Sequence, residues 1–318
     1  MQFFLVIVGF CLGLLFIIKG GDWFVDSASY AAEATGIPKF IIGATIVSIA
    51  TTLPELMVSS IAASCGKVDM AVGNAVGSVI ANIALILSLS ILFTQIIVKN
   101  RRILSTKMLL FLATVIALVL LSLQGSIGIG KSLILFALLG LYLYENLKSA
   151  RQNVEANETV SKDRKTITIN ILKFVVGIVG IVIGSRLLVT DGSAIARRLG
   201  VSEAVISLTA ISIGTSLPEL VTAISAMLKK ESSLSVGNIF GANVFDLALV
   251  LPVCGIISSV HDKVPLPISQ IMLQRDVVMM CAVSLIATVP VLIKGRFMKW
   301  QGVVLVLAYA GYLYWLHL

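Results

Sequence analysis

Long apolar stretches alternate with short polar breaks along the whole chain. Most of the apolar stretches reach or exceed the roughly 17–25 residues that an α-helix needs to cross about 30 Å of hydrocarbon. The pattern therefore predicts an all-α polytopic membrane protein with ten transmembrane helices. The expected spans lie near residues 2–19, 38–64, 70–95, 103–122, 127–145, 167–188, 202–228, 234–258, 277–293 and 300–316.

One polar stretch is much longer than the others and divides the chain. Residues 146–166 carry eight Lys, Arg, Asp and Glu side chains between the fifth and sixth spans. We interpret this stretch as a linker between a first half, residues 1–145, and a second half, residues 167–318. No separate soluble domain is visible.

The two halves are related to each other. Shifting the sequence by 164 positions aligns them without a gap, and eight of the fourteen residues in 43–56 are identical to those in 207–220. General hydrophobicity would not match Pro, Glu and Thr in register. Because five spans separate equivalent points, the halves must cross the membrane in opposite directions. The sequence thus predicts two inverted five-helix repeats, an arrangement in which secondary transporters bind their substrates near the midplane.

Composition and charge agree with a membrane location. Of the 318 residues, 58% are hydrophobic and 13% are charged. The net charge of +8 comes from Lys and Arg in short loops, which is typical of membrane topology and does not indicate nucleic-acid binding. One side of the predicted topology collects 17 of the 24 basic residues. We therefore expect a multi-pass protein of the cell membrane with a cytoplasmic 146–166 linker and both termini outside.

Two acidic motifs stand where a membrane helix normally has none. Pro54-Glu55 lies in the second span and Pro218-Glu219 occupies the equivalent place in the seventh. Each proline deprives a carbonyl four residues earlier of its helical partner. A carboxylate near the midplane is expensive and usually has a partner and a function. No basic residue lies within these segments, so a bound cation is the expected partner.

Oxygen-bearing side chains surround these glutamates at helical spacing. The next helix of each half adds further amides, hydroxyls and a carboxylate, four residues apart. Oxygen ligation without His or Cys suits hard cations such as Ca²⁺ and Na⁺ and argues against zinc or copper. The predicted ligands are Ser48, Thr51, Thr52, Glu55, Ser78 and Asn82 in the first half, and Ser212, Thr215, Ser216, Glu219 and Asp246 in the second; Asn74 and Asn238 also offer oxygen, whereas Ala242 does not.

Three carboxylates in one low-dielectric site suggest obligatory exchange. Glu55, Glu219 and Asp246 together carry a charge of −3 when ionised. Such a site is strongly disfavoured when it is empty. It should therefore switch from facing one side of the membrane to facing the other only when a cation or proton occupies it. This hypothesis favours an antiporter in which Ca²⁺ and other cations neutralise the same site in turn.

These motifs resemble the alpha repeats of the sodium/calcium exchanger family, within the calcium/cation antiporter superfamily. The resemblance rests on Ala50–Glu55 with Gly73–Ser78, and on Gly214–Glu219 with Gly237–Asp246. It covers nearly the whole chain, including the ten-span plan, and the short linker is typical of a prokaryotic member.

The resemblance implies that Glu55 and Glu219 are central Ca²⁺ ligands. Thr51 and Thr215 would assist them, and Asn82 and Asp246 would close the site between flanking Na⁺ sites. It also implies that the first and sixth helices slide against the remaining bundle. Ala242 stands where the family usually has serine, so the Na⁺ stoichiometry remains open.

The function expected on these grounds is secondary active exchange of Na⁺ for Ca²⁺. An H⁺/Ca²⁺ antiporter and a K⁺-dependent Na⁺/Ca²⁺ antiporter on the same scaffold stay open as alternatives. A channel is less favoured because the polar groups concentrate in one layer. An intramembrane hydrolase is disfavoured because no protease-like motif occurs, so we do not expect an enzyme. We expect no cofactor and no obligate protein partner, only the two ions and the lipid bilayer.

Overall fold

The computed structural model describes residues 2–96, 98, 100–153, 163–200 and 214–316. Nearly all of these residues are helical, which confirms the predicted all-α class. The first half contains α1 (Gln2–Thr35), α2 (Lys39–Ile42), π-helix η1 (Gly43–Val47), α3 (Ser48–Ser64), α4 (Val68–Ala81), π-helix η2 (Asn82–Leu87), α5 (Ser88–Phe93), α6 (Arg101–Ser122) and α7 (Ile129–Gln152). The second half contains α8 (Arg164–Arg198), α10 (Leu217–Leu228), α11 (Ser232–Phe245), π-helix η3 (Asp246–Val250), α12 (Leu251–His261), α13 (Gln270–Met272), π-helix η4 (Leu273–Val277), α14 (Val278–Lys294) and α15 (Lys299–Leu316).

Helical runs match the predicted spans closely. In the described part of the chain, eight runs are long and apolar enough to cross a membrane. The other two predicted spans correspond to α10 and α15; the beginning of the former, 202–213, lies outside the described residues. Helix α7 continues to Gln152 and α8 begins at Arg164, so both helices extend into the predicted linker. The stretch 154–162 of that linker also lies outside the described residues.

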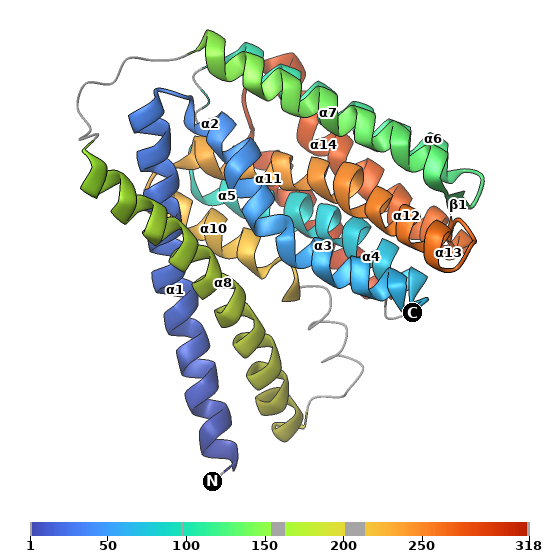
Figure 1. Ribbon diagram of the computed structural model, residues 1–318, viewed down its shortest axis with the longest axis horizontal. Helices are drawn as coiled ribbons and strands as arrows, with labels where there is room; N and C mark the ends of the chain where they lie inside the picture. The colour runs from blue at the N-terminus through green and yellow to red at the C-terminus, as the bar shows by residue number, and fades with distance from the viewer. Residues whose placement is uncertain (1, 97, 99, 154–162, 201–213, 317–318) are drawn as a thin grey trace.

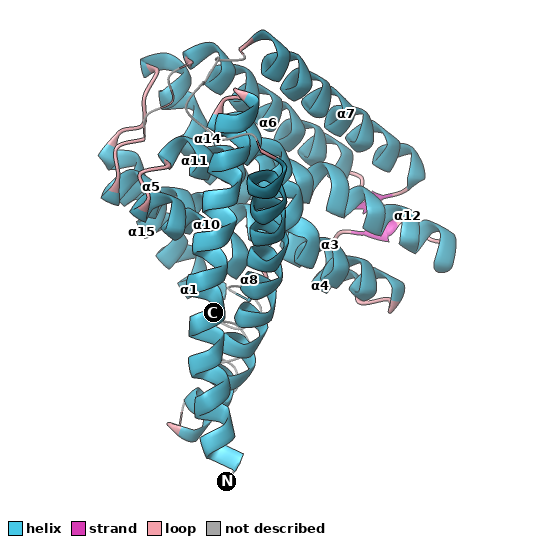
Figure 2. Ribbon diagram, turned by 60° about the vertical axis from the view of Figure 1, so that its left-hand side comes forward, coloured by secondary structure: helices cyan, strands magenta, loops and turns pink. Residues whose placement is uncertain are grey.

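Helices α1 and α8 form a long antiparallel pair beside the other helices (Figure 1). They contain 34 and 35 residues, well beyond the predicted spans 2–19 and 167–188. At 1.5 Å per residue each is roughly 50 Å long, which exceeds the hydrocarbon thickness. The pair therefore must tilt or project from the bilayer. Figure 2 shows the same two helices side by side from a second direction.

Glycines bring the α1 and α8 backbones into contact. A Cβ atom at Gly13 would lie 3.1 Å from the Gly184 carbonyl oxygen, and one at Gly20 would lie 2.8 Å from that of Gly177. The 164-residue shift relates Gly13 to Gly177 and Gly20 to Gly184. Each contact is therefore the symmetry mate of the other, as expected when a twofold axis relates two segments. This reciprocal packing supports the inverted repeat at atomic detail.

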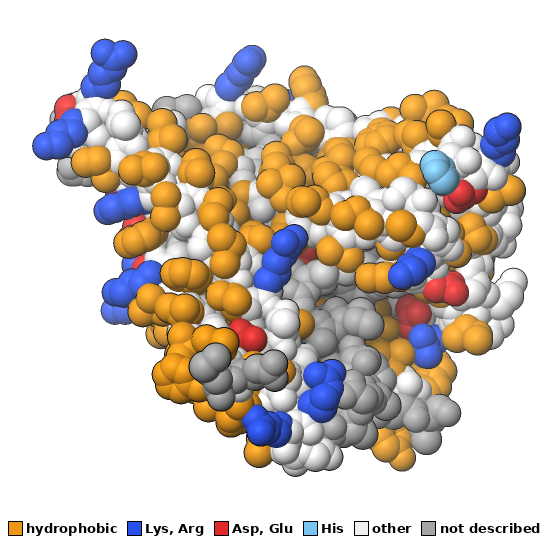
Figure 3. Space-filling view, turned by 60° about the horizontal axis from the view of Figure 1, so that its bottom comes forward, with side chains coloured by type: hydrophobic (Ala, Val, Ile, Leu, Met, Phe, Trp, Pro, Cys, Tyr) orange, Lys and Arg blue, Asp and Glu red, His pale blue; other side chains and the backbone are white. Residues whose placement is uncertain are grey.

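The remaining helices enclose the main hydrophobic core. It contains buried side chains from α2 to α7 and from α10 to α15, whereas a smaller cluster including Phe24 and Ile181 joins α1, α8 and α10. The outer surface carries many exposed apolar side chains, as a lipid-facing surface requires (Figure 3). One short antiparallel strand pair, β1 (Ser126–Ile127) with β2 (Leu266–Pro267), joins two loops at one end.

Two π-helices occupy equivalent positions in the repeats. Segment η2 begins at Asn82 and η3 begins at Asp246, which the 164-residue shift superimposes. A π-helical turn redirects the side chains that follow it and often occurs at functional sites. The two predicted ligands Asn82 and Asp246 therefore lie where an α-helix changes into a π-helix.

Candidate functional site

Three buried carboxylates form what we call the acid cluster: Glu55, Glu219 and Asp246. Each is only 1% exposed. Glu55 interacts electrostatically with both of the others, and Asp246 also interacts with Glu219. The structure therefore brings together acids from α3, α10 and the start of η3. The sequence predicted these three residues as ligands, and the structure buries all three.

Much of the acid cluster lacks hydrogen-bond partners. Within the described part of the chain, both carboxylate oxygens of Glu55, one of Glu219 and one of Asp246 are buried and unsatisfied. No Lys, Arg or His among the described residues makes an ion pair with them. Burying carboxylates in this way is costly unless a cation or a proton compensates. The arrangement is suited to receiving positive charge.

The two glutamates stand in different backbone settings. Pro54 lies inside α3, and the helix continues through it to Ser64. Pro218 lies in the first turn of α10, after a turn at Thr215-Ser216. A first-turn proline loses no helical hydrogen bond, and the positive end of the helix dipole favours Glu219 there. The sequence predicted that each proline leaves a carbonyl four residues earlier without its helical partner; in the second half the structure places Pro218 at a helix start instead.

Hydroxyls and amides connect the two repeats around the acid cluster. Thr51 Oγ1 donates to Asn238 Oδ1 at 3.2 Å, and Thr215 Oγ1 donates to Asn74 Oδ1 at 3.0 Å. The 164-residue shift converts one bond into the other. Thr51 also interacts with Glu219. The predicted residues Thr51 and Thr215 therefore lie at the interface between the halves, each held by an asparagine of the opposite half.

A third hydrogen bond between the repeats has no symmetry-related counterpart. Ser216 Oγ donates to Ser78 Oγ at 3.3 Å. The equivalent positions in the other half are Thr52 and Ala242, and alanine offers no hydroxyl. Thr52 is 2% exposed and its Oγ1 has no partner among the described residues. The departure at Ala242 thus leaves one buried hydroxyl unsatisfied.

Asn243 was not among the predicted ligands, yet it lies next to one of them. Asn82 Nδ2 donates to Asn243 Oδ1 at 3.1 Å, and both side chains are at most 1% exposed. Asn82 Oδ1 has no partner in the described structure and remains available to a cation. The spacing of Asn243 three residues before Asp246 could have suggested this contact.

Ser48 has a packing role in the structure. Its hydroxyl donates to the Gly43 carbonyl at 2.7 Å and to the Asn238 carbonyl at 3.0 Å. A Cβ at Gly241 would collide with Ser48 Oγ, so α11 lies directly against this part of the first repeat. Such bonding between helices is common for serine in membranes. Its symmetry mate, Ser212, lies outside the described residues.

Carboxylates alone do not make a metal site here. Among the residues that the structure describes, no three His, Cys, Asp or Glu side chains converge closely enough to hold a metal ion. A cation between the repeats would therefore need the neighbouring hydroxyl and amide oxygens as well. Hard cations such as Ca²⁺ and Na⁺ accept such mixed oxygen ligands.

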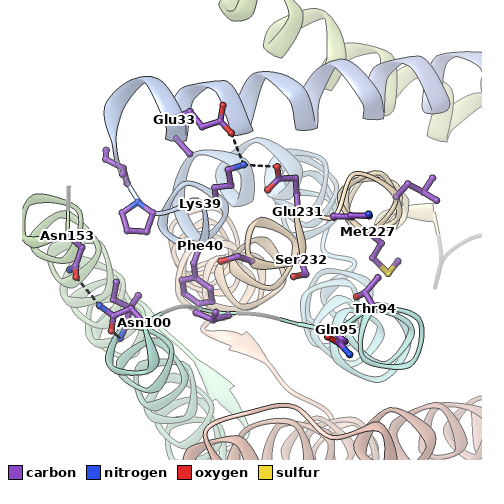
Figure 4. Close-up of a pocket in the computed structure, with 18 of the residues that line it drawn as sticks. Glu33, Lys39, Phe40, Thr94, Gln95, Asn100, Asn153, Met227, Glu231 and Ser232 are labelled. Atoms are coloured by element: carbon purple, nitrogen blue, oxygen red, sulfur yellow. Dashed lines mark hydrogen bonds and ion pairs between the residues drawn. The ribbon is translucent and has the colours of Figure 1, made fainter. Parts of the chain in front are cut away.

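A separate cavity of about 1360 Å³ lies where α1 turns into α2. Its lining includes Thr94, Gln95, Val98, Asn100 and the α10–α11 turn, and none of the acid-cluster residues reaches it. Inside it, Lys39 Nζ lies 2.8 Å from Glu33 and 2.6 Å from Glu231 (Figure 4). These ion pairs tie α1, α2 and the start of α11 together at this end.

Comparison with known proteins agrees with this architecture. The chain matches the family described as "Sodium/calcium exchanger protein" over residues 5–148 and 169–318. It is 34% identical over 327 residues to the inner membrane protein YrbG of Escherichia coli, covering 96% of this chain and 95% of that protein. It is 30% identical over 346 residues to the sodium/calcium exchanger MaX1 of Methanosarcina acetivorans, covering 95% of each.

A solved structure shows the same fold. The sodium-calcium exchanger NCX_Mj, soaked with 10 mM Na⁺ and zero Ca²⁺, superimposes with a TM-score of 0.84 at 28% identity and with 97% of each chain covered. The fold and these matches define the class of the molecule as a multi-pass cation/Ca²⁺ antiporter. More particularly, the chain belongs to the sodium/calcium exchanger family, whose members are transporters and not enzymes. The family predicted from the alpha-repeat motifs is confirmed.

Proposed function

We propose that the protein exchanges Na⁺ for Ca²⁺ across the cell membrane by alternating access. The observation that carries this proposal is the acid cluster, in which four of the six carboxylate oxygens have no hydrogen-bond partner among the described residues. Hydroxyls and amides from both repeats surround it, which gives one site that either hard cation could neutralise. NCX_Mj, the similar solved structure, was soaked with Na⁺ together with Ca²⁺ or Sr²⁺ in other experiments.

In this proposal the ligands divide between a central site and its flanks. Glu55, Glu219 and Asp246 supply charge for Ca²⁺, and Thr51, Thr215 and Asn82 add neutral oxygens. Ser78 and Ser216 form a flanking Na⁺ site on one side. Thr52 contributes to the other and Ser212 stays in the predicted set, whereas the Ser48 hydroxyl, bonded to two backbone carbonyls, is used for packing.

The charged loops support one orientation. The positive-inside rule places the 146–166 linker and the Lys39 cavity in the cytoplasm, and both termini outside. With this orientation, we expect α1 and α8, held close together by their glycine contacts, to slide as a pair against the remaining bundle.

Proton coupling is the second candidate. The unpartnered Thr52 hydroxyl opposite Ala242 favours it, because one flanking site lacks an oxygen that Na⁺ would require. A proton needs no such cage and can neutralise a carboxylate directly. The same fold would then exchange H⁺ for Ca²⁺.

Transport in proteoliposomes separates these two functions. Vesicles loaded with Na⁺ are diluted into choline buffer containing ⁴⁵Ca²⁺, and a parallel sample receives a pH jump without Na⁺. Uptake that requires internal Na⁺ supports the proposal. Uptake driven only by the pH gradient would replace it with the proton-coupled function, and uptake without either gradient would contradict both.

A further inference from the structure

Tyr142 reaches from α7 to the helix that carries Glu55. Its side chain is 1% exposed, and its hydroxyl donates to the Ala44 carbonyl at 3.1 Å. Ala44 belongs to η1, the π-helical turn directly before α3. In an α-helix the Ser48 amide would bond to the Ala44 carbonyl, but here it bonds to the Gly43 and Thr45 carbonyls instead. The tyrosine hydroxyl therefore attaches to the backbone where the winding changes.

This turn also lies in close contact with the second repeat. A Cβ at Gly241 would lie 2.8 Å from both the Cα and the carbonyl oxygen of Ala44. One helical turn later, Ser48 bonds to the Asn238 carbonyl, and Thr51 bonds to the Asn238 side chain. A shift of η1 along α11 would consequently move Thr51 and Glu55 relative to the ligands of the second half.

The ring of Tyr142 contacts the second half as well. It packs edge-to-face against Phe245, with ring centroids 6.4 Å apart and an interplanar angle of 86°. Phe245 directly precedes Asp246 at the start of η3. One side chain from α7 thus contacts the backbone leading to Glu55 and the residue next to Asp246.

A buried ammonium group holds the ring from another direction. Lys107 Nζ lies 5.8 Å from the centre of the Tyr142 ring. The lysine is fully buried, and its Nζ has no hydrogen-bond partner in the described part of the chain. Glu145, one turn after Tyr142 on α7, supplies opposite charge. A desolvated ammonium over an aromatic ring is attracted to it, so Lys107 restricts where the ring can lie.

We propose that Tyr142 is a positioning residue of the cation site, anchored by Lys107, which sets the register between the Glu55 helix and the Asp246 helix. This inference rests on the proposed function, because it concerns the same site. It assigns a role in positioning the cation site to Tyr142 and Lys107, which are not cation ligands themselves.

Tyr142→Phe tests the hydroxyl. The variant keeps the ring and its contacts with Phe245 and Lys107, and it loses the hydroxyl's bond to Ala44 and its interaction with Asn146. We expect the Ca²⁺ concentration for half-maximal exchange to rise about three- to tenfold, the effect of one lost hydrogen bond, with the maximal rate retained. Tyr144→Phe is the matched control, because that tyrosine lies on the same helix and is 60% exposed; it should leave both parameters unchanged.

The outcomes are distinct. Unchanged half-saturation in Tyr142→Phe would overturn the proposal, as would a loss of thermal stability and rate without any change in half-saturation, which marks a purely structural role. If the wild-type protein itself shows neither ion exchange nor Ca²⁺-dependent thermal stabilisation, the proposed function fails first and this inference fails with it.

Lys107→Met tests the anchor. The variant preserves the length of the side chain and removes the charge. If Lys107 acts through the ring, half-saturation should rise, and the double variant with Tyr142→Phe should be less than additive. A fall in half-saturation would show instead that Lys107 repels the transported cation at long range, and additive effects would show that it acts independently; either result would overturn its assignment as an anchor.

Discussion

Neutralising one member of the acid cluster should change stability and cation binding in opposite directions. In Glu55→Gln the side chain keeps its size but loses a charge that faces Glu219 and Asp246. Two unit charges about 4 Å apart interact by about 4 kcal/mol at an effective dielectric constant of about 20. Protonation relieves part of this repulsion, so we expect the variant without cations to be about 1–3 kcal/mol more stable than the wild type.

The same substitution removes attraction for a divalent ion. Because Ca²⁺ carries two charges, the lost attraction exceeds the relieved repulsion, and we expect Ca²⁺ affinity to fall at least about a hundredfold. The assay is thermal unfolding of purified protein in detergent, with and without Ca²⁺. Glu145→Gln, a carboxylate of α7 outside the acid cluster, is the control and should leave the Ca²⁺-dependent shift intact.

Either of two results would contradict these expectations for Glu55→Gln. A Glu55→Gln protein that is still stabilised by Ca²⁺ as strongly as the wild type would show that Glu55 is not a ligand. A variant that is destabilised without cations would show that the wild-type carboxylate is held by favourable contacts and not by repulsion awaiting a cation.

Three further substitutions, one of them with a matched control, test the Na⁺ site, the helix packing and the ion pairs. Ala242→Ser would give the Thr52 hydroxyl a partner and should lower the Na⁺ concentration for half-maximal exchange, whereas an unchanged Na⁺ dependence would separate this position from Na⁺ binding. Gly20→Ala would place a methyl group 2.8 Å from an α8 carbonyl oxygen and should lower thermal stability by about 1–3 kcal/mol despite the better helix propensity of alanine. Gly140→Ala, which meets no described atom within 4 Å, should be neutral or stabilising, and equal effects of the two glycine variants would contradict the packing argument. Lys39→Met should reduce stability by about 1 kcal/mol or less at low salt, and a loss that persists at high salt would indicate lost packing instead of lost ion pairs.

Much of this molecule was predictable because membranes restrict the choices available to a chain. Backbone groups in lipid must be paired within a helix, so apolar length alone located the spans. The repeated Pro-Glu motif then identified Glu55 and Glu219, because carboxylates in a membrane are rarely accidental. The threonines and asparagines followed from helical spacing, since residues three or four apart share a face.

Other features depend on tertiary contacts that no local pattern records. The helices α1 and α8 extend past their apolar spans because their polar ends find partners, such as Lys229 for Asp26 at 2.8 Å. The π-helical turns depend on neighbouring helices for support, as the Tyr142 hydroxyl illustrates at η1. Ser48 resembled a ligand by spacing, yet the close approach of Gly241 uses its hydroxyl for packing. Only the folded structure shows which polar group is already occupied.

In the proposed function, Ca²⁺ and Na⁺ share one site between the repeats. Calorimetric Ca²⁺ titrations of the purified protein at increasing Na⁺ test it most directly, with choline keeping the ionic strength constant. The account predicts that the apparent Kd for Ca²⁺ rises steeply with Na⁺, more than in proportion, because several Na⁺ ions must leave before Ca²⁺ binds. A Kd that does not change with Na⁺ would contradict a shared site.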